Sequence, residues 1–277
     1  GKLMVPHMWC KRTIHYFGNV STRKYTPSSN PPTIRDVMML GVFFIQGRKS
    51  MIKTAILIDG AFYRKRAYHI YGDKTPAERA KELSTYCHRH IVEEKEGASL
   101  YRVFYYDCPP SSKNIYHPLL KRAINLGNTP DYTWATEFFN ELKHQRKFAL
   151  RLGRLAEEQA LFNLKPETTK KLLSGKITVE QLTEKDFSLS ISQKGVDMRI
   201  GVDISSLAFK KQVDRIILIS GDSDFVPAAK QARREGIDFI LDPMRSPIKE
   251  DLYEHIDGIR TKAPKLTAAT NSENSPQ

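Results

Sequence analysis

Aspartates end several apolar segments of this chain, and their spacing predicts a shared site. Asp59, Asp107 and Asp242 each come directly after a short run of branched or aromatic residues. Asp222 follows another such run after one Ser and one Gly, and Asp224 comes two residues later. Crowded carboxylates repel one another and raise each other's pKa unless a cation neutralises them. Hard oxygen ligands without nearby Cys or His favour Mg²⁺ or Mn²⁺.

Each aspartate taken alone also has a structural explanation. Aspartate is a favoured helix N-cap, and a strand-to-helix turn is where such a cap belongs. One cap needs one carboxylate, however, and the turn after residues 213–220 carries both Asp222 and Asp224. Ser220 and Ser223 flank these acids. We leave open whether the two serines contact a phosphate beside the N–H groups of the next helix, or cap that helix.

The elements that must position these acids alternate between strand and helix. Apolar segments predict buried strands at residues 54–58, 100–106, 213–220 and 237–241. Helical patterns lie at residues 76–95, 196–210, 223–235 and 247–255. This order predicts an α/β fold with a central parallel sheet and helices on both faces. In such sheets the ligand site lies beyond the carboxyl ends of the strands, where the acids would meet.

Charge and composition divide the chain into three parts. The formal net charge is +13, and residues 1–50 contain eight Lys or Arg but a single acid, Asp36. We interpret residues 1–50 as a disordered basic extension, with translation starting upstream of Met51, and an organellar transit peptide is the alternative. Residues 51–260 form the expected domain, with an inserted helical segment at about 112–194. Residues 261–277 are expected to be a disordered tail.

Cysteine usage and hydropathy favour a cytoplasmic protein without a membrane partner. The three cysteines, Cys10, Cys87 and Cys108, have the spacing of neither a disulfide framework nor a zinc site. The apolar run at residues 37–45 is far shorter than the ~20 residues that span a bilayer. Within the inserted segment we expect helices at residues 116–126, 133–147 and 166–174. The oligomeric state is left open, and a homo-oligomer is allowed.

Three motifs together resemble the NYN domain family. They are ILIDG at residues 56–60, KGVD at 194–197 and ISGDSDFVP at 219–227. Residues 105–110, with two prolines after Asp107, are similar to the bacterial LabA-like branch. The resemblance covers residues 51–260. It implies a PIN-like three-layer sandwich and a nuclease that cleaves RNA, most simply single-stranded RNA, with Mg²⁺ or Mn²⁺ as cofactor.

The resemblance also assigns the site residues. It implies that Asp59, Asp197, Asp222 and Asp224 form the catalytic and metal-binding pocket. Asp203 matches a further acid of the family, and it lies six residues after Asp197, about 600° around a helix. We therefore expect Asp203, like Asp107, Ser220 and Ser223, to support the pocket from outside the metal shell. Asp242 is interpreted as a turn residue.

Substrate binding requires cations and stacking surfaces outside the acidic pocket. The candidates for RNA binding are Arg64, Lys65, Arg66, Lys121, Arg122, Arg146 and Lys147. Alternatively, these cations lie on solvent-exposed helix faces and do not bind RNA. Tyr63, Tyr116, Tyr132 and Trp134 are candidates for base stacking, with core packing as the alternative.

Two other functions remain open on the sequence alone. Many NYN domains have an Asn shortly after the first Asp-Gly, whereas Asp59-Gly60 is followed by Ala61-Phe62. A catalytically weak RNA-binding or regulatory adaptor would fit this departure. A Toprim-type enzyme acting on DNA also has two acids with one residue between them after a strand, but its first strand usually begins the site with a glutamate.

Overall fold

The structure is a computed structural model that describes residues 51–265. The predicted basic extension of residues 1–50, and the tail prediction from residue 266 onward, lie outside the described residues. No helix within the described range is long and apolar enough to cross a membrane.

A six-stranded parallel sheet forms the centre of the fold, in the order β12-β11-β10-β1-β2-β5. Its strands are β1 (Ile52–Asp59), β2 (Ala98–Asp107), β5 (Phe148–Leu152), β10 (Arg215–Ile219), β11 (Asp238–Asp242) and β12 (Gly258–Ile259). The predicted α/β class with a central parallel sheet is confirmed. The buried, nearly continuous apolar character of β1 and β10 reflects a sheet that is covered on both faces.

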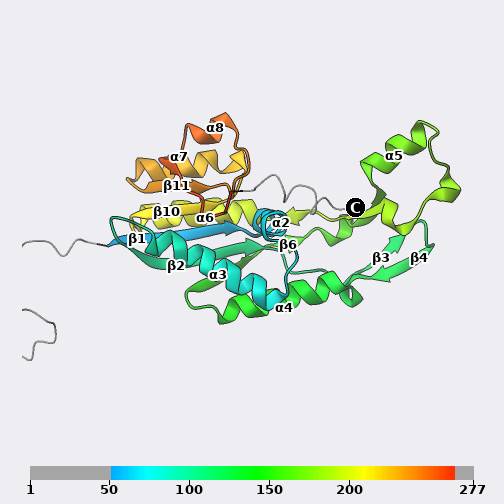
Figure 1. Cartoon of the computed structure of the whole chain (residues 1–277), viewed down its shortest axis with the longest axis horizontal. Helices are drawn as coiled ribbons and strands as arrows, with labels where there is room; N and C mark the ends of the chain where they lie inside the picture. Colours follow the sequence, from blue (N-terminus) through cyan, green and yellow to red (C-terminus); the bar gives the residue numbers. More distant parts are fainter. Residues whose placement is uncertain (1–50, 266–277) are drawn as a thin grey trace, which may run out of the picture. The chain divides into compact units, whose positions relative to one another are not determined.

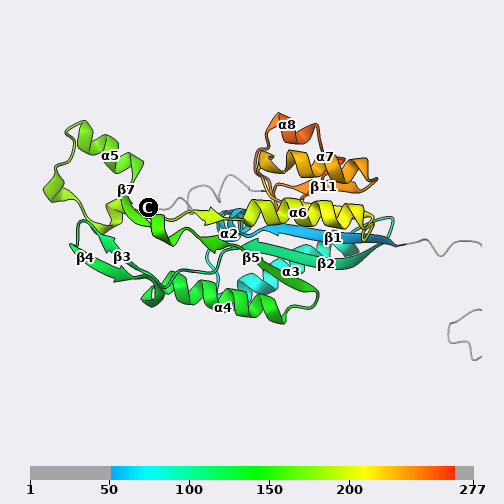
Figure 2. The ribbon, with the colours of Figure 1, turned by 180° about the vertical axis from the view of Figure 1, so that it is seen from behind.

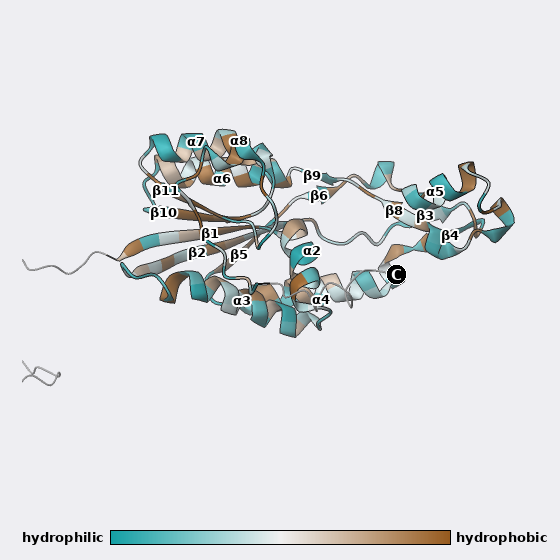
Figure 3. Cartoon of the chain, turned by 45° about the horizontal axis from the view of Figure 1, so that its top comes forward, coloured by the Kyte–Doolittle hydropathy of each residue, from teal (hydrophilic) through white to brown (hydrophobic). Residues whose placement is uncertain are grey.

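Helices cover both faces of this sheet. Figures 1 and 2 show α6 (Val196–Phe209), α7 (Val226–Arg234) and α8 (Glu250–Tyr253) on one side, and α3 (Pro76–Val92) and α4 (Pro130–His144) on the other. Alternate residues of β1 enter two separate cores, because successive strand side chains point to opposite faces. Leu57 belongs to the same core as Ile200 of α6, whereas Ile58 belongs to the core that contains Leu83 of α3. Figure 3 shows the apolar residues concentrated in the strands, as in β10.

Local sequence signals explain where the main helices begin. Thr75 and Glu78 form a reciprocal capping box, with Pro76 as the first residue of α3. Thr129 caps α4 before Pro130 by accepting a hydrogen bond from the backbone N–H of Tyr132, without the reciprocal second bond. A short helix missed by the sequence analysis, α2 (Gly60–Tyr71), follows β1 directly and is capped by Asp59.

The segment of residues 112–194 contains more strand than the sequence predicted. The helix expected at 116–126 is wrong, because these residues belong to a hairpin of β3 (Asn114–His117) and β4 (Arg122–Asn125). Apolar residues at 116, 119, 120 and 124 mimic a helical period, but Leu119 and Leu120 lie in the turn. Along β3 burial alternates instead, with Ile115 and His117 buried.

The rest of this segment combines helices and short antiparallel strands. Helices occur where expected at α4 and at α5 (Pro166–Leu173), whereas β5 joins the central sheet beside β2. Four short strands pair beyond it: β6 (Arg154–Leu155) with β9 (Gln193–Lys194), and β7 (Leu161–Leu164) with β8 (Phe187–Ser190). The predicted helix at 223–235 is a single 3-10 turn, Ser223–Phe225, followed by α7.

Candidate functional site

The carboxyl ends of the central strands bring four candidate residues to one edge of the sheet. Asp59 ends β1, Asp107 ends β2 and Asp242 ends β11, while Ser220 directly follows β10. The parallel registers pair Ile58 with Ile219, and Ile219 with Asp242. Since all these strands run in the same direction, their last residues lie side by side, as expected for an open α/β sheet.

Asp59 occupies the centre of this edge and is held by two hydrogen bonds. Its Oδ1 accepts a hydrogen bond of 3.1 Å from the backbone N–H of Phe62, which caps α2. Its Oδ2 accepts one of 3.3 Å from the hydroxyl of Ser220, which is fully buried. The N-cap explanation of Asp59 is therefore correct, but it accounts for only one carboxylate oxygen.

Asp222 and Asp224 lie in the turn that follows β10. The backbone N–H of Asp222 donates to the Ser220 hydroxyl at 3.3 Å. The Asp222 side chain accepts a hydrogen bond of 3.1 Å from the backbone N–H of Asp224, so it caps the 3-10 turn. The Asp224 side chain is exposed. One residue of this pair is thus the cap, and the other adds a carboxylate that capping does not require.

Asp197 reaches the same region from the first turn of α6. Gly195 precedes this helix with a φ of 78°, a left-handed conformation that glycine adopts without strain. This turn lets the chain enter α6 immediately after the two-residue strand β9. The Lys-Gly-Val-Asp motif therefore encodes a turn that fixes where Asp197 lies, as well as the carboxylate itself.

The charges of neighbouring aspartates act on two of the four acids, Asp59 and Asp197. Burial raises the pKa of Asp59 above its ordinary value, and the charges of Asp197 and Asp222 raise it further, against the lowering effect of its hydrogen bonds. Burial also raises the pKa of Asp197, with added repulsion from Asp222 and Asp224. Asp59 and Asp197 therefore each lie within electrostatic reach of at least two other aspartates. Among residues 51–265, however, no three Asp, Glu, His or Cys side chains are arranged to hold a metal ion by themselves.

Asp107 lies at the same edge, but other side chains and backbone groups of the protein already neutralise and hydrogen-bond its carboxylate. Its side chain is fully buried and forms an ion pair with Arg64. Tyr105 and Gln193 donate side-chain hydrogen bonds of 3.1 Å to it, and the backbone N–H of Cys108 donates one of 2.8 Å. These partners use both carboxylate oxygens, so Asp107 braces the ends of β2 and α2.

Gly60 is required for this packing. A Cβ atom at Gly60 would lie 2.5 Å from Asp107 Oδ2 and 2.6 Å from the carbonyl oxygen of Tyr106. The Asp59-Gly60 motif therefore combines a carboxylate with a residue that lets α2 start against the end of β2.

Asp203 and Asp242 lie apart from the four-acid cluster. Asp203 accepts a hydrogen bond of 2.8 Å from the hydroxyl of Tyr106 and pairs with Arg151 at 3.1 Å. It is not among the charges that act on Asp59 or Asp197. Asp242 is fully buried and accepts hydrogen bonds from His90, Tyr86 and the backbone N–H of Met244.

The predicted RNA-binding cations are dispersed over the domain. Lys65 is exposed near the start of α2, whereas Arg64 is paired with Asp107 and Arg66 donates to the carbonyl oxygen of Met244. The cations on the β3–β4 hairpin and those before β5 are also exposed: Lys121, Arg122, Arg146 and Lys147. Arg146 and Lys147 precede a strand of the parallel sheet, so they lie at the edge opposite the acids.

Two polar residues near the site escaped the sequence analysis. Lys249 donates from its Nζ to the Ser223 hydroxyl at 3.1 Å, from 26 residues further along the chain. Gln193, which contacts Asp107, stands directly before the Lys-Gly-Val-Asp motif. The position of Gln193 beside a motif was a signal for its role, but nothing in the local sequence of Lys249 indicates its partner.

The candidate stacking residues also have different surroundings. Tyr63 is fully buried and donates to Glu82 at 3.0 Å, so core packing explains it. Tyr116 is exposed on β3. Tyr132 and Trp134 both line a cavity next to Asp107 and Arg64.

Comparisons with known proteins identify the family of this chain. A 58-residue segment is 33% identical to an uncharacterized protein of Methanocaldococcus jannaschii, over 21% of this chain and 24% of that protein. The chain thus matches about a quarter of the length of this curated relative. A solved protein of unknown function from Vibrio parahaemolyticus is 17% identical, with a TM-score of 0.41 over 78% of this chain and 94% of that one.

A family match covers half of the chain and includes three of the four acids. The family model of the NYN domain matches residues 112–251, which contain Asp197, Asp222 and Asp224. Asp59, which comes from β1, lies outside the matched range but is held to the matched part through Ser220. The chain belongs to the NYN domain family.

Proposed function

We propose that this NYN domain is a PIN-like, LabA-like ribonuclease that hydrolyses single-stranded RNA with Mg²⁺ or Mn²⁺. NYN domains are typically nucleases, which supports an enzymatic role in general. The metal dependence, the RNA substrate and the roles of individual residues are our inference from the geometry at the carboxyl edge of the sheet.

One observation carries this proposal: aspartates from three distant segments lie within electrostatic reach of Asp59 or Asp197. Asp59 and Asp197 both have raised pKa values, partly because neighbouring aspartates repel their charge. Repulsion of this kind destabilises the ionised site and is relieved when a cation binds. A purely structural cluster would be expected to contain arginine or lysine partners, as Asp107 does with Arg64.

The donor chemistry fits a hard divalent cation. The four side chains offer carboxylate oxygens, and Mg²⁺ is usually bound through one or two carboxylates together with waters and substrate phosphates. This mode of binding does not require three protein ligands at one point, so it agrees with the spacing of the acids in the described residues. When bound, such an ion lowers the pKa of a coordinated water and offsets negative charge on the attacked phosphate.

The residues around the pocket would prepare it for this chemistry. Ser220 and the Phe62 N–H fix the orientation of the Asp59 carboxylate before any ligand arrives. The Ser220 hydroxyl also accepts the N–H of Asp222, which ties the turn after β10 to the end of β1. Preorganisation of this kind keeps acids from separate segments at fixed positions relative to the substrate.

Lys249 supplies a positive charge beside the turn that carries Asp222 and Asp224. Its Nζ lies 3.1 Å from the Ser223 hydroxyl, and Ser223 stands between Asp222 and Asp224. A lysine ammonium beside a hydroxyl is suited to contact a phosphate oxygen of an RNA backbone. Lys65 and the exposed cations of the β3–β4 hairpin, Lys121 and Arg122, would contact phosphates further along the strand.

A cleavage assay with a charge-matched pair of variants tests the proposal. End-labelled single-stranded RNA and DNA of the same sequence are incubated with Mg²⁺, Mn²⁺ or a chelator. We expect cleavage of RNA that the chelator abolishes. Asp222→Asn should reduce the cleavage rate by about tenfold to a hundredfold. This is the loss of activity typically seen when a residue that supports a metal site is removed. Asp214→Asn makes the same charge change at the opposite end of β10 and should leave the rate unchanged.

The outcomes of this assay separate the alternatives. Equal cleavage by wild type and Asp222→Asn would show that the metal pocket is misassigned. Binding of RNA without cleavage under every metal condition would favour the adaptor function. Preferential cleavage of DNA would favour the Toprim-type alternative.

A further inference from the structure

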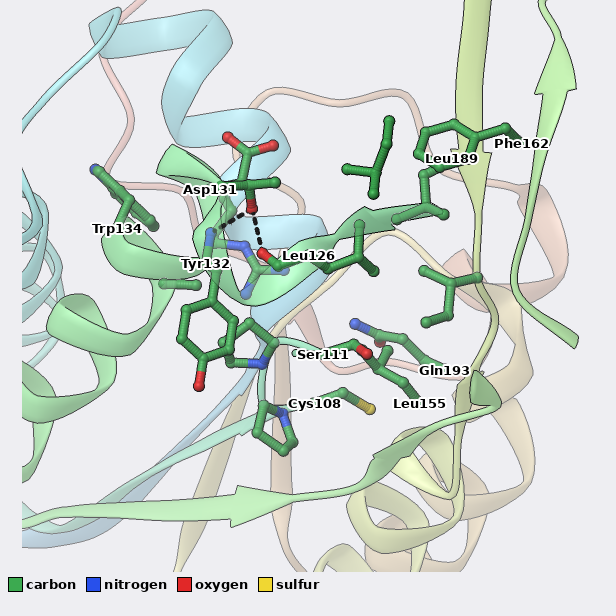
Figure 4. A pocket seen from close by; sticks show the side chains of 17 residues that line it. Cys108, Ser111, Leu126, Asp131, Tyr132, Trp134, Leu155, Phe162, Leu189 and Gln193 are labelled. Atoms are coloured by element: carbon green, nitrogen blue, oxygen red, sulfur yellow. Dashed lines mark hydrogen bonds between the residues drawn. The ribbon is translucent and has the colours of Figure 1, made fainter. Parts of the chain in front are cut away.

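A cavity of about 750 Å³ is lined in part by Arg64 and Gln193, the partners of Asp107 at the carboxyl edge of the sheet, and the proposed function does not use it. Figure 4 shows Tyr132 and Trp134 of α4 on one side and Phe162 of β7 with Leu189 of β8 on the other. The volume is within the usual range of about 300–1,000 Å³ for small-ligand sites. The cavity is therefore large enough for a flat organic group, and it is lined mostly by the segment 112–194, with Arg64 and residues 108–111 completing the wall.

The lining combines apolar walls with a few polar groups. Leu155, Phe162 and Leu189 supply apolar surface, whereas Gln193 and Ser111 offer hydrogen-bonding groups. The Phe162 ring packs against His117 with 4.6 Å between ring centroids, which fixes this wall from behind. Apolar walls with a small number of polar groups are typical of sites that recognise a flat, polar-edged ligand.

Tyr132 is the wall residue best suited to stack on such a ligand. It is half-buried at the start of α4, where Thr129 accepts its backbone N–H and holds the turn. Trp134 is already engaged, because its Nε1 donates to the carbonyl oxygen of Lys74 at 2.9 Å and its ring stacks on Phe138. The aromatic side of the cavity is thus rigid behind Tyr132.

The cavity is connected to the acidic cluster through three lining residues. Arg64 lies five residues after Asp59 on α2, roughly 7 Å along the helix axis. Gln193 precedes Asp197 by four residues, and both Arg64 and Gln193 bond to Asp107. The Cys108 thiol, also on the wall, is within the electrostatic reach of Asp197.

The cavity lining has one exposed carboxylate, Asp131, and the ion-paired Arg64, whereas the β3–β4 hairpin that contributes Ile124 to the lining carries cations that could hold a polyanion. Residues 112–129, which form the β3–β4 hairpin and its flanks, contain Lys113, Lys121 and Arg122 and no acidic residue. All three cations belong to exposed residues. A strand whose phosphates lie along this hairpin would have its bases free to enter the cavity, because single-stranded RNA is recognised largely through unstacked bases.

We propose that this cavity binds one unpaired base of the RNA strand, next to the nucleotide that is cleaved. The inference rests on the proposed function, since it takes the substrate to be single-stranded RNA. The base would stack on Tyr132 between the apolar walls, and Gln193 would face its polar edge. Such a site makes segment 112–194 a determinant of which sequence is cleaved, in addition to its place in the fold.

A scan with abasic nucleotides tests the proposal. The substrate is a short single-stranded oligoribonucleotide in which each base is removed in turn, and KM and kcat are measured for each version. We expect one position near the cut at which base removal raises KM about tenfold, near the lower end of base–aromatic stacking energies of ~1–3 kcal/mol. Tyr132→Ala should raise KM for the intact substrate by a similar factor. In this variant, removal of the base at that position should no longer change KM.

A cavity-filling variant and its neighbour provide the matched control. Leu189→Trp fills the cavity from β8 and should abolish the effect of base removal. Ser188→Trp adds the same side chain at the preceding, exposed residue of β8 and should behave as wild type. Thermal unfolding of both variants shows whether each remains folded, and Tyr132→Ala provides an independent test if Leu189→Trp does not.

The results distinguish failure of this inference from failure of the proposed function. Cleavage of RNA with the same KM at every abasic position would overturn the base site and leave the nuclease proposal intact. If no metal supports cleavage, binding of oligoribonucleotides with a single 2-aminopurine is measured by fluorescence in chelator. Quenching at one position that Leu189→Trp removes would still support base binding. Equal fluorescence with and without protein at all positions would overturn it.

Discussion

Ser220 donates a hydrogen bond to Asp59 across the ends of two neighbouring strands, with 3.3 Å between Oγ and Oδ2. The same hydroxyl oxygen accepts the backbone N–H of Asp222 at an equal distance. Ser220 is fully buried, so it joins the acid of β1 to the acidic turn after β10 within the protein interior. The proposed pocket is therefore assembled by a side chain that does not itself need to bind a metal.

Removal of this hydroxyl should change the pH dependence of cleavage. The Ser220 hydrogen bond lowers the pKa of Asp59, so Ser220→Ala should raise that pKa further. Asp59 must be ionised to bind a cation, and the acidic limb of the kcat/KM profile should therefore move to higher pH. The variant should also lose about 1–2 kcal/mol in the free energy of unfolding, because the Asp222 N–H loses its acceptor.

A second serine variant controls for loss of a hydroxyl alone. Ser205 donates to the carbonyl oxygen of Gly201 within α6, away from the acidic cluster. Ser205→Ala should leave the acidic limb where it is in wild type. An unshifted limb in Ser220→Ala would contradict the positioning role of Ser220.

Neutralisation of Asp59 should stabilise the protein when divalent metal is absent. The folded-state pKa of Asp59 is raised above its ordinary value of 3.8, so the folded state binds this proton more tightly than the unfolded state does. The resulting stability is present below pH 3.8 and is lost as the pH rises through the folded-state pKa. Asp59→Asn keeps the N-cap, since Asn and Asp cap about equally well. In chelator at pH 7 it should therefore unfold at a higher temperature than wild type.

The comparison of melting temperatures is repeated at lower pH and with Mg²⁺. The difference between Asp59→Asn and wild type should shrink as the pH falls below 3.8, where the wild-type carboxyl is protonated in both the folded and the unfolded state. Mg²⁺ should raise the melting temperature of wild type by more than that of the variant. If the metal stabilises both proteins equally, Asp59 is not part of its site.

The strand pattern predicts the nearness of Asp59 and Asp222 better than it predicts which acids at this edge are already paired. Parallel strands place their carboxyl ends at one edge, and this rule was sufficient to expect Asp59 and Asp222 in the same region. Asp107 follows an equally apolar strand, yet its partners Arg64 and Gln193 lie 43 and 86 residues away. Local patterns contain no information about such contacts, so the strand pattern alone does not separate Asp107 from Asp59, and only the family resemblance placed Asp107 outside the metal shell.

The lack of tertiary information also explains why the sequence could not separate free from paired cations, and why it predicted a helix at residues 116–126. Arg64, Lys65 and Arg66 form one basic run, but only Lys65 lacks a pairing that the fold requires among the contacts described. At residues 116–126 an apolar period near that of a helix was produced by turn residues. Only tertiary contacts distinguish a paired cation from a free one, or a hairpin from a helix, because the local sequence is compatible with both.

Gly60 provides a stability test of the contact between α2 and β2. A Cβ at this position would meet Asp107 Oδ2 and the Tyr106 carbonyl oxygen within 2.6 Å. Gly60→Ala should therefore lower the free energy of unfolding by about 1–3 kcal/mol, as in other overpacked sites. Gly201→Ala, in the interior of α6, meets nothing within 4 Å and should raise it by roughly 0.5–1 kcal/mol. Chemical denaturation of both variants gives the comparison, and a similar change in both would contradict the close approach.

Arg64 and Lys65 should separate stability from RNA binding. Arg64→Met leaves the buried Asp107 carboxylate without its ion pair. Loss of one partner of a buried pair costs about 3–5 kcal/mol, and we expect about 2–3 kcal/mol here because the Arg64 side chain is partly exposed to water. Lys65→Met removes a neighbouring exposed cation and should change stability by less than about 0.5 kcal/mol.

In an RNA-binding assay at varied salt concentration, Lys65→Met should have the larger effect on affinity, although Arg64→Met has the larger effect on stability. Lys65→Met should weaken binding and reduce the dependence of log K on log salt by about one phosphate contact. Arg64→Met, measured at a temperature where it is folded, should retain the wild-type salt dependence because its charge is already paired with Asp107. A reduced slope in Arg64→Met would mean that this arginine leaves Asp107 to contact RNA, and the brace between α2 and β2 would then open when substrate binds.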